Sequence, residues 1–237
     1  MSSLTTIGFD ADDTLWQNEQ FFRLTERRFA ELLADHGDAA AIMSRLLEAE
    51  KRNLQFYGFG VKGFTLSMIE TAIEVTDGRV PAASIREILA FGREMLRHPV
   101  ETLPHVRETL EALAGDYRIL LITKGDLFDQ ERKLAQSGLG DLFDAVEIVS
   151  DKQAATYARI FSRHGDGAER SMMVGNSLKS DVVPALEAGG WGVYVPHDLT
   201  WVLEHMEEPT DSPRFRRIEH LGALIGVVQD IQAGARR

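Results

Sequence analysis

The sequence predicts an α/β protein in which helices cover both faces of a parallel β-sheet and an inserted helical domain interrupts the alternation. Two observations indicate this fold. Short apolar segments alternate with amphipathic helical segments at the start of the chain and again after about residue 100, which is typical of parallel strands joined by helical crossovers. Between these regions, residues 18–100 contain helical patterns and no clear strand.

Five apolar runs predict the strands of the sheet. Runs that are apolar along their whole length are typical of strands buried on both faces, as in a parallel sheet. The predicted strands cover residues 4–10, 118–123, 145–149, 171–175 and 191–196.

Segments with helical periodicity lie between and after these strands. Gly138 follows one of them, at the position where a left-handed residue commonly closes a helix. The predicted helices cover residues 105–114, 127–137, 153–164, 180–188 and 221–233. Together with the strands they assign residues 1–17 and 101–237 to one α/β core.

The insert of residues 18–100 is expected to form a small helical domain of its own. Pro81 suits the start of its last helix. Residues 55–64, "QFYGFGVKGF", combine three glycines with aromatic residues and Lys62, so we expect a loop here. The predicted helices of the insert cover residues 19–36, 39–53, 64–76 and 82–97.

Composition narrows the class of protein. The net charge is −11, and no basic stripe appears along the chain, which argues against nucleic-acid binding. The sequence contains no cysteine, so thiol catalysis, disulfides and thiolate metal sites are excluded. No signal peptide precedes the first strand and no window is apolar enough to span a membrane, so a cytoplasmic location is expected.

Three carboxylates, Asp10, Asp12 and Asp13, follow the first predicted strand directly. Clustered carboxylates repel one another unless a cation neutralises them or one of them holds a proton. A hard divalent ion such as Mg²⁺ would meet this need with oxygen ligands. A simple capping turn, which Asp and Thr residues commonly make, is the alternative explanation.

Polar residues also follow three further strands, and ligands of open parallel sheets bind at this edge. Thr123 ends the second strand and offers a hydroxyl group, Lys152 follows the third, and Asn176 and Asp181 follow the fourth. Each has an ordinary explanation as a helix cap or a solvated surface group. Together they place acids, a hydroxyl and an amine at successive strand ends of one sheet.

At this point the sequence resembles the haloacid dehalogenase-like superfamily over nearly its whole length. "DADDTL" at Asp10 matches the first motif, Asp-x-Asp-x-Thr, and "LLIT" ending at Thr123 matches the second. Lys152 matches the third motif, and "VGNSLKSD", which ends at Asp181, matches the fourth. The resemblance implies a three-layer Rossmann-like core and identifies the helical insert as an α-helical cap.

The resemblance also implies a mechanism. Asp10 would be the nucleophile that forms an aspartyl-phosphate, and Asp12 would protonate the leaving group and later activate water. Thr123 and Lys152 would hold the transferring phosphoryl group. Mg²⁺ would be held by the Asp10 carboxylate, the Asp12 main-chain carbonyl and the fourth motif. The implied protein is a phosphatase of a small phosphorylated metabolite.

The fourth motif departs from the family pattern, because Asn176 occupies a position that is usually Asp. We expect Asp181 to supply the acidic metal contact, directly or through water, with Asn176 as a weaker ligand. Lys124 and Lys62 are candidate substrate contacts, and surface roles are equally open to them.

Other activities share these motifs. A phosphomutase is one alternative, and a 2-haloacid dehalogenase is another, although dehalogenases lack an acid at the position of Asp12. An inactive binding protein with the same fold is an alternative from a different class. The sequence makes no prediction about oligomeric state.

Overall fold

The structure, a computed structural model, describes residues 3–235 of the chain. The chain divides into two compact units. The first comprises Met1–Glu19, Val100–Lys124 and Gln130–Arg237, and the second comprises Gln20–Pro99 and Gly125–Asp129. Each unit has a hydrophobic core of its own.

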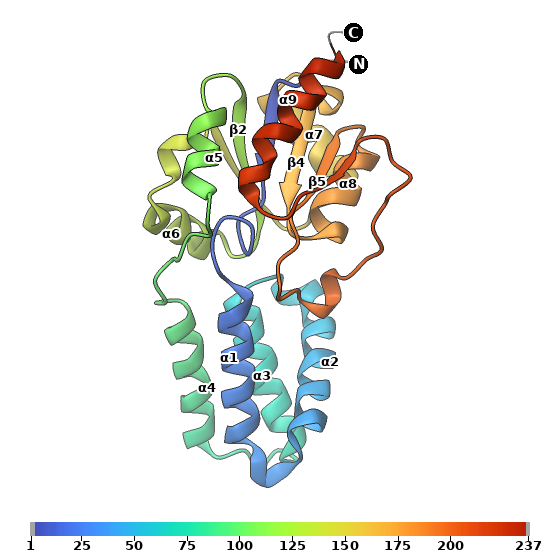
Figure 1. The fold of residues 1–237 in the computed structure, drawn as a ribbon. Helices are drawn as coiled ribbons and strands as arrows, with labels where there is room; N and C mark the ends of the chain where they lie inside the picture. The colour runs from blue at the N-terminus through green and yellow to red at the C-terminus, as the bar shows by residue number, and fades with distance from the viewer. Residues whose placement is uncertain (1–2, 236–237) are drawn as a thin grey trace. The chain divides into compact units, whose positions relative to one another are not determined.

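The first unit contains a six-stranded parallel sheet with the strand order β3-β2-β1-β4-β5-β6. Strands β2, β4 and β5 of this sheet are labelled in Figure 1. In the middle of the sheet, Phe9 of β1 lies beside Leu121 of β2 and Val174 of β4. The carboxyl ends of these three strands therefore meet at one edge. The strands are β1 (Thr6–Phe9), β2 (Arg118–Lys124), β3 (Ala145–Val149), β4 (Ser171–Gly175), β5 (Trp191–Tyr194) and β6 (Phe215–Arg217).

The parallel sheet and its five predicted strands are confirmed, but β6 was not predicted. Its sequence, "FRR", is short and polar, so it carries no apolar signal. The strand pairs with β5, and the Arg216 guanidinium lies 5.0 Å from the centre of the Trp191 ring. Contacts between residues far apart in the sequence thus define this edge of the sheet.

Helices cover both faces of the sheet, because successive side chains of a strand point to opposite faces. On one face, Phe9, Leu121 and Val174 pack with α5 and α9. On the other, Leu120, Ile122 and Met173 pack with α7 and α8. The architecture is therefore a three-layer, Rossmann-like fold. The helices of the first unit are α5 (Val106–Leu113), α6 (Leu127–Ser137, whose first three residues cluster with the second unit), α7 (Ala154–His164), α8 (Val183–Glu187) and α9 (Leu224–Ala235).

The second unit is built mainly from four helices around a core that includes Phe29, Leu46, Met68 and Ile88. Asp38 caps the second of them by accepting a hydrogen bond from the main chain of Ala41. Among residues 3–235, none of the helices combines the length and apolar composition of a membrane span. The four helices are α1 (Glu19–Leu32), α2 (Ala39–Tyr57), α3 (Val61–Val75) and α4 (Ala82–Met95).

The loop predicted over residues 55–64 is much shorter than expected. Helix α2 continues to Tyr57 and α3 begins at Val61. Gly58 and Gly60 both have positive φ angles, +69° and +111°, so these glycines suffice to break the helix. As a result Lys62 lies in the first turn of α3 rather than in a flexible segment.

Candidate active site

The chain leaves β1 in a tight turn that is fixed by main-chain hydrogen bonds. The Asp10 N–H donates to the main-chain oxygen of Val174 at 2.9 Å, which extends the sheet by one residue. Asp13 then adopts a left-handed conformation with a φ of 59°. Its carboxylate accepts hydrogen bonds from the main-chain N–H groups of Asn18 and Glu19. Asp13 thus caps the start of α1, which agrees with the alternative explanation that acids after the first strand form a capping turn.

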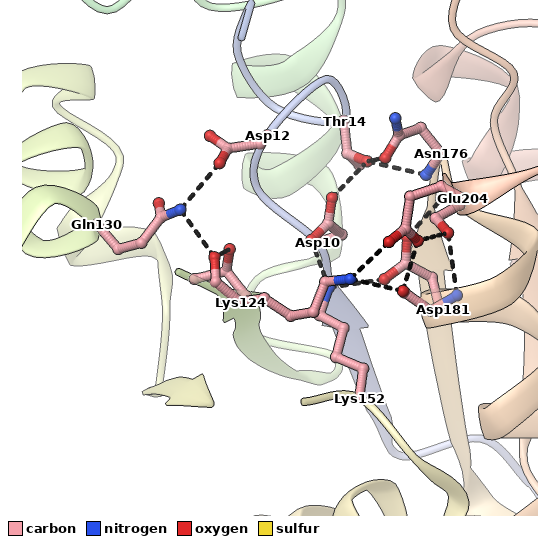
Figure 2. Close-up of polar contacts among 12 residues, drawn as sticks. Asp10, Asp12, Thr14, Lys124, Gln130, Lys152, Asn176, Asp181 and Glu204 are labelled. Atoms are coloured by element: carbon pink, nitrogen blue, oxygen red, sulfur yellow. Dashed lines mark hydrogen bonds and ion pairs between the residues drawn. The ribbon is translucent and has the colours of Figure 1, made fainter. Parts of the chain in front are cut away.

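Asp10, Lys152 and Asp181 form a buried ion-pair cluster at the carboxyl edge of the sheet (Figure 2). The Lys152 ammonium contacts Asp10 Oδ1 and lies 2.6 Å from Asp181 Oδ1. The other oxygen of Asp181 accepts a hydrogen bond from the Ser177 main-chain N–H at 3.0 Å. Three of the predicted site residues, from three different strand ends, are therefore in direct contact.

For both Lys152 and Asp10 in this cluster, burial shifts the pKa in one direction, and the neighbouring charge of opposite sign shifts it in the other. Burial alone would lower the pKa of Lys152, but the contacts with Asp10 and Asp181 outweigh it and raise the pKa above its ordinary value. Burial, reinforced by the negative charge of Asp181, raises the pKa of Asp10 to about 7 even though Lys152 opposes the shift. Lys152 therefore stays charged, and a second cation would be needed to keep Asp10 fully ionised at neutral pH.

Asn176 lies beside Asp10 and the β1 turn. When its side-chain nitrogen faces the turn, the amide donates to the Asp12 main-chain oxygen at 3.2 Å and to Asp10 Oδ2 and Thr14 Oγ1 at 3.3 Å. With the opposite orientation, the amide oxygen accepts a hydrogen bond from Thr14 Oγ1. In that orientation it also faces the oxygens of Asp10 and Asp12, so a cation is required to bring the three oxygens together.

This donor set fits Mg²⁺. Mg²⁺ binds oxygen ligands in an octahedron at 2.0–2.1 Å, so neighbouring ligand oxygens lie about 2.9 Å apart. The Asn176 amide is 3.2 Å from the Asp12 main-chain oxygen and 3.3 Å from Asp10 Oδ2, close to that spacing. Within residues 3–235, no three His, Asp or Glu side chains form a metal cluster. The ligands that fit Mg²⁺ are therefore the Asp10 carboxylate, the Asp12 main-chain carbonyl and the Asn176 side-chain amide.

The Asp12 side chain points away from Asp10 and toward α6 (Figure 2). Its Oδ1 accepts hydrogen bonds from Trp16 Nε1 at 2.7 Å and Lys133 Nζ at 2.8 Å, and its Oδ2 accepts one from Gln130 Nε2 at 2.9 Å. Burial tends to raise the pKa of Asp12, but Lys133, Gln130 and Trp16 together lower it below its ordinary value. The carboxylate is thus ionised and held by three donors.

Lys124 and Glu204 form a second polar cluster next to the first. The Lys124 ammonium lies 2.7 Å from Glu204 Oε1 and 2.7 Å from Ser180 Oγ. The hydroxyls of Ser177 and Ser180 both donate to Glu204 Oε2. Burial would raise the pKa of Glu204, but Lys124 and the two serines lower it to about 2.

The remaining predicted residues are placed differently. Thr123 is buried at the end of β2, where its hydroxyl lies 3.3 Å from the main-chain oxygen of Lys124. Lys62 belongs to the second unit, where its ammonium lies 2.9 Å from both carboxylate oxygens of Asp126. The ammonium of Lys62 is thus occupied by a carboxylate of the same unit.

Three residues that contact the predicted site residues Asp12 and Lys124 were not predicted from the sequence. Gln130 and Lys133 lie three residues apart in a predicted amphipathic helix, and polar residues on its buried side were the available signal. Glu204 lies in the long segment between β5 and β6 and carries no local signal. Long connections often carry functional residues, and the length of this segment was the one indication that it could reach the site.

Comparisons with known proteins agree with this geometry. A family model described as haloacid dehalogenase-like hydrolase matches residues 4–189, well over half of the chain. A haloacid dehalogenase-like family hydrolase from Xanthomonas campestris, known as a crystal structure, is 46% identical with a TM-score of 0.89. That similarity covers 99% of this chain and 94% of the other.

Two curated relatives are named glyceraldehyde 3-phosphate phosphatase. The protein from Methanothermobacter thermautotrophicus is 27% identical over 209 residues, which cover 83% of this chain and 88% of the relative. The protein from Methanocaldococcus jannaschii is 25% identical over 239 residues, which cover 95% of this chain and 97% of the relative. The similarity thus extends over most of both chains.

Proposed function

Because this chain belongs to the haloacid dehalogenase-like hydrolase family, we propose that it is a Mg²⁺-dependent phosphatase that acts on a small phosphorylated metabolite. The observation that carries the proposal is the contact of a buried lysine, Lys152, with the Asp10 carboxylate at the edge of the sheet. Phosphoryl transfer needs charge neutralisation and alignment more than other chemistry, and this arrangement offers both. The names of the two curated relatives support the same activity.

In the first half-reaction Asp10 attacks phosphorus, so that a bond forms between its carboxylate oxygen and phosphorus while the ester P–O bond breaks. The negative charge of the bound phosphate raises the pKa of Asp12, so that its carboxylate takes up a proton from solvent and then gives that proton to the departing oxygen. Lys152 and Thr123 hold the oxygens of the phosphoryl group as charge builds on them.

In the second half-reaction a water molecule attacks the phosphorus of the aspartyl-phosphate, and Asp12 takes a proton from that water. Inorganic phosphate leaves, and the Asp10 carboxylate is restored. Asp181 acts through Lys152, because one of its oxygens holds the ammonium and the other accepts from the Ser177 main chain.

The residues that would hold Mg²⁺ are Asp10, Asp12 through its main-chain oxygen, and Asn176. When bound, the ion would supply the positive charge that offsets the phosphoryl oxygens and keeps Asp10 ionised. Direct ligation by Asp181 remains a prediction, and its contacts with Lys152 and Ser177 favour a contact through water instead.

The second unit is proposed to act as the cap that selects the substrate, because it is inserted in the chain between β1 and β2. Lys62 remains a candidate contact, although it is paired with Asp126. Glyceraldehyde 3-phosphate, which appears in the names of the relatives, is the first substrate to test, followed by other small phosphate esters.

Hydrolysis of p-nitrophenyl phosphate tests the proposal. We expect turnover with Mg²⁺, no turnover after metal removal by EDTA, and loss of activity in Asp10→Asn. Asp116→Asn, a change at an exposed aspartate in a turn, is the matched control and should retain activity. Activity in EDTA, or an active Asp10→Asn variant, would contradict the proposal.

A further inference from the structure

The Asp12 side chain is held by donors that lie outside the sequence motifs. Gln130 and Lys133 are three residues apart on α6 and so project from the same side of that helix. Their side chains reach Asp12 across 118 and 121 residues of sequence. Trp16, four residues after Asp12, supplies the third donor from a fully packed indole ring.

The two carboxylate oxygens of Asp12 are used unequally. An ionised carboxylate offers about four lone-pair positions, two on each oxygen. Oδ1 accepts from both Trp16 and Lys133, whereas Oδ2 accepts from Gln130 among the described contacts. One lone-pair position of Oδ2 is thus left for a proton that is shared with a reacting group.

The two α6 side chains are themselves fixed by second contacts. Gln130 is buried, and its Nε2 also donates to the Lys124 main-chain oxygen at 2.9 Å. Turning its amide over would bring Oε1 against two acceptors, so its orientation is determined even though Oε1 is buried without a hydrogen-bond partner. Lys133 also donates to Asn18 Oδ1 at 2.9 Å. These donors therefore hold Asp12 in one position.

We propose that Gln130 and Lys133 are positioning residues for proton transfer by Asp12, and that Asp12 Oδ2 is the oxygen that exchanges the proton with the leaving group. This inference rests on the proposed phosphatase function. When the anionic ester binds, Oδ2 takes up a proton from solvent, and this proton passes to the ester oxygen as the P–O bond breaks. Oδ2 later takes a proton from the attacking water, which restores the protonated carboxyl group. Gln130 and Lys133 give up no proton in either step.

The loss of a positioning residue changes the kinetics differently from a general loss of protein stability. An alkyl leaving group needs a proton as it departs, whereas p-nitrophenolate departs readily as an anion. The ratio kcat/KM reports the steps up to the first irreversible one, which here is the transfer of the phosphoryl group to Asp10. Poor alignment of Asp12 should therefore lower kcat/KM for alkyl phosphates selectively.

The test compares Lys133→Met and Gln130→Met with wild type on an alkyl phosphate and on p-nitrophenyl phosphate. Both variants keep an unbranched chain and remove the donor. We expect kcat/KM for the alkyl phosphate to fall about tenfold or more, with a change of about twofold or less for p-nitrophenyl phosphate. Arg132→Met, which removes a neighbouring cation of α6 that pairs with Gln136, is the matched control and should change neither value.

Equal losses on the two substrates, or no loss on either in an active enzyme, would overturn the inference. Thermal melting identifies a variant that fails to fold, in which case the other variant carries the test. An inactive wild-type protein would instead refute the proposed phosphatase function, so the two failures are distinguishable.

Discussion

The surroundings of the Asp10 carboxylate favour the binding of a cation. Its carboxylate is buried beside Asp181, and these two influences raise its pKa to about 7 despite the contact with Lys152. The proposed nucleophile must be ionised to attack phosphorus, and a pKa of about 7 keeps part of the Asp10 carboxylates protonated near neutral pH when no metal is bound. The cation proposed here would therefore complete the site as well as bind the phosphoryl group.

The raised pKa of Asp10 predicts a pH dependence of stability in the absence of metal. Between the ordinary value of 3.8 and about 7, the unfolded chain loses this proton before the folded one does. Rising pH therefore favours unfolding across this window. We expect the Tm of EDTA-treated protein to fall between pH 5 and 7, as measured by calorimetry.

Asp13 has a pKa that burial raises to about 6, and it would contribute to the same trend. The Asp10→Asn variant separates the two groups, because it keeps Asp13 and removes the Asp10 proton. We expect a clearly shallower fall of Tm in this variant. Equal slopes in the two proteins would show that Asp10 does not titrate as described.

At the scale of elements, the turn after β4 depends on a glycine. A Cβ atom on Gly175 would lie 2.7 Å from Asp181 Cβ and closer still to the Asp181 carboxyl group. Asp181 sits in a single π-helical turn, Leu178–Val182, and its carboxylate holds Lys152. Such turns are often found at functional sites. The tight turn lets β4 end directly against the ion-pair cluster.

Gly175→Ala is therefore expected to displace Asp181 and with it Lys152. A displacement of about 1 Å at a catalytic group can cost on the order of 100-fold in rate. If Lys152 has its proposed role, we expect a loss of this size in kcat. Gly226→Ala in α9 is the control, since a Cβ there meets no atom within 4 Å. It should leave kcat unchanged and add about 0.5 to 1 kcal/mol of stability. A Gly175→Ala enzyme as active as this control would contradict the role of the turn.

The segment between β5 and β6 is anchored at the site by Glu204, in the 3-10 turn Val202–Glu204. The folded pKa of Glu204 is about 2 and its ordinary value is 4.5, so its ion pair stabilises the fold above pH 4.5. This stabilisation is lost as the pH falls toward 2. A shift of this size corresponds to about 3 kcal/mol at neutral pH and about 1 kcal/mol at pH 3.

Glu204→Gln should lower the free energy of unfolding by about 3 kcal/mol at pH 7 and by about 1 kcal/mol at pH 3, as measured by urea denaturation. Glu94→Gln removes an exposed ion pair with Arg28 and serves as the control. It should cost less than about 1 kcal/mol at either pH. If Glu204→Gln and Glu94→Gln lowered the free energy of unfolding equally at pH 7, the Glu204 cluster would stabilise the fold no more than an exposed ion pair does.

At the scale of the whole molecule, local patterns predicted most of the fold. Apolar runs located β1 to β5, and helical periodicity located the four helices of the insert. Every residue of β1 and β4 is buried, whereas β3, at an edge of the sheet, is only partly buried and was found from its apolar residues alone. The boundaries of α2 and α3 were wrong because two glycines with positive φ were taken for a longer loop. Short, polar β6 left no local pattern to find.

The candidate site was predictable only in part. Asp10, Lys152 and Asp181 follow strands whose ends meet by the geometry of a parallel sheet, so their proximity followed from topology. Gln130 and Glu204 reach the site from a helix and from an irregular segment, and side-chain packing decides where they point. Periodicity cannot supply that information.

The central claim is that the Asp10 carboxylate becomes bonded to phosphorus during turnover. Rapid acid quenching of the enzyme with a phosphate ester and Mg²⁺, followed by proteolysis and mass spectrometry, tests it most directly. We expect a phosphoryl group on the peptide that contains Asp10, at that residue, with no such adduct in Asp10→Asn. Turnover accompanied by a phosphoryl group on another residue, or by none at any quench time, would contradict it.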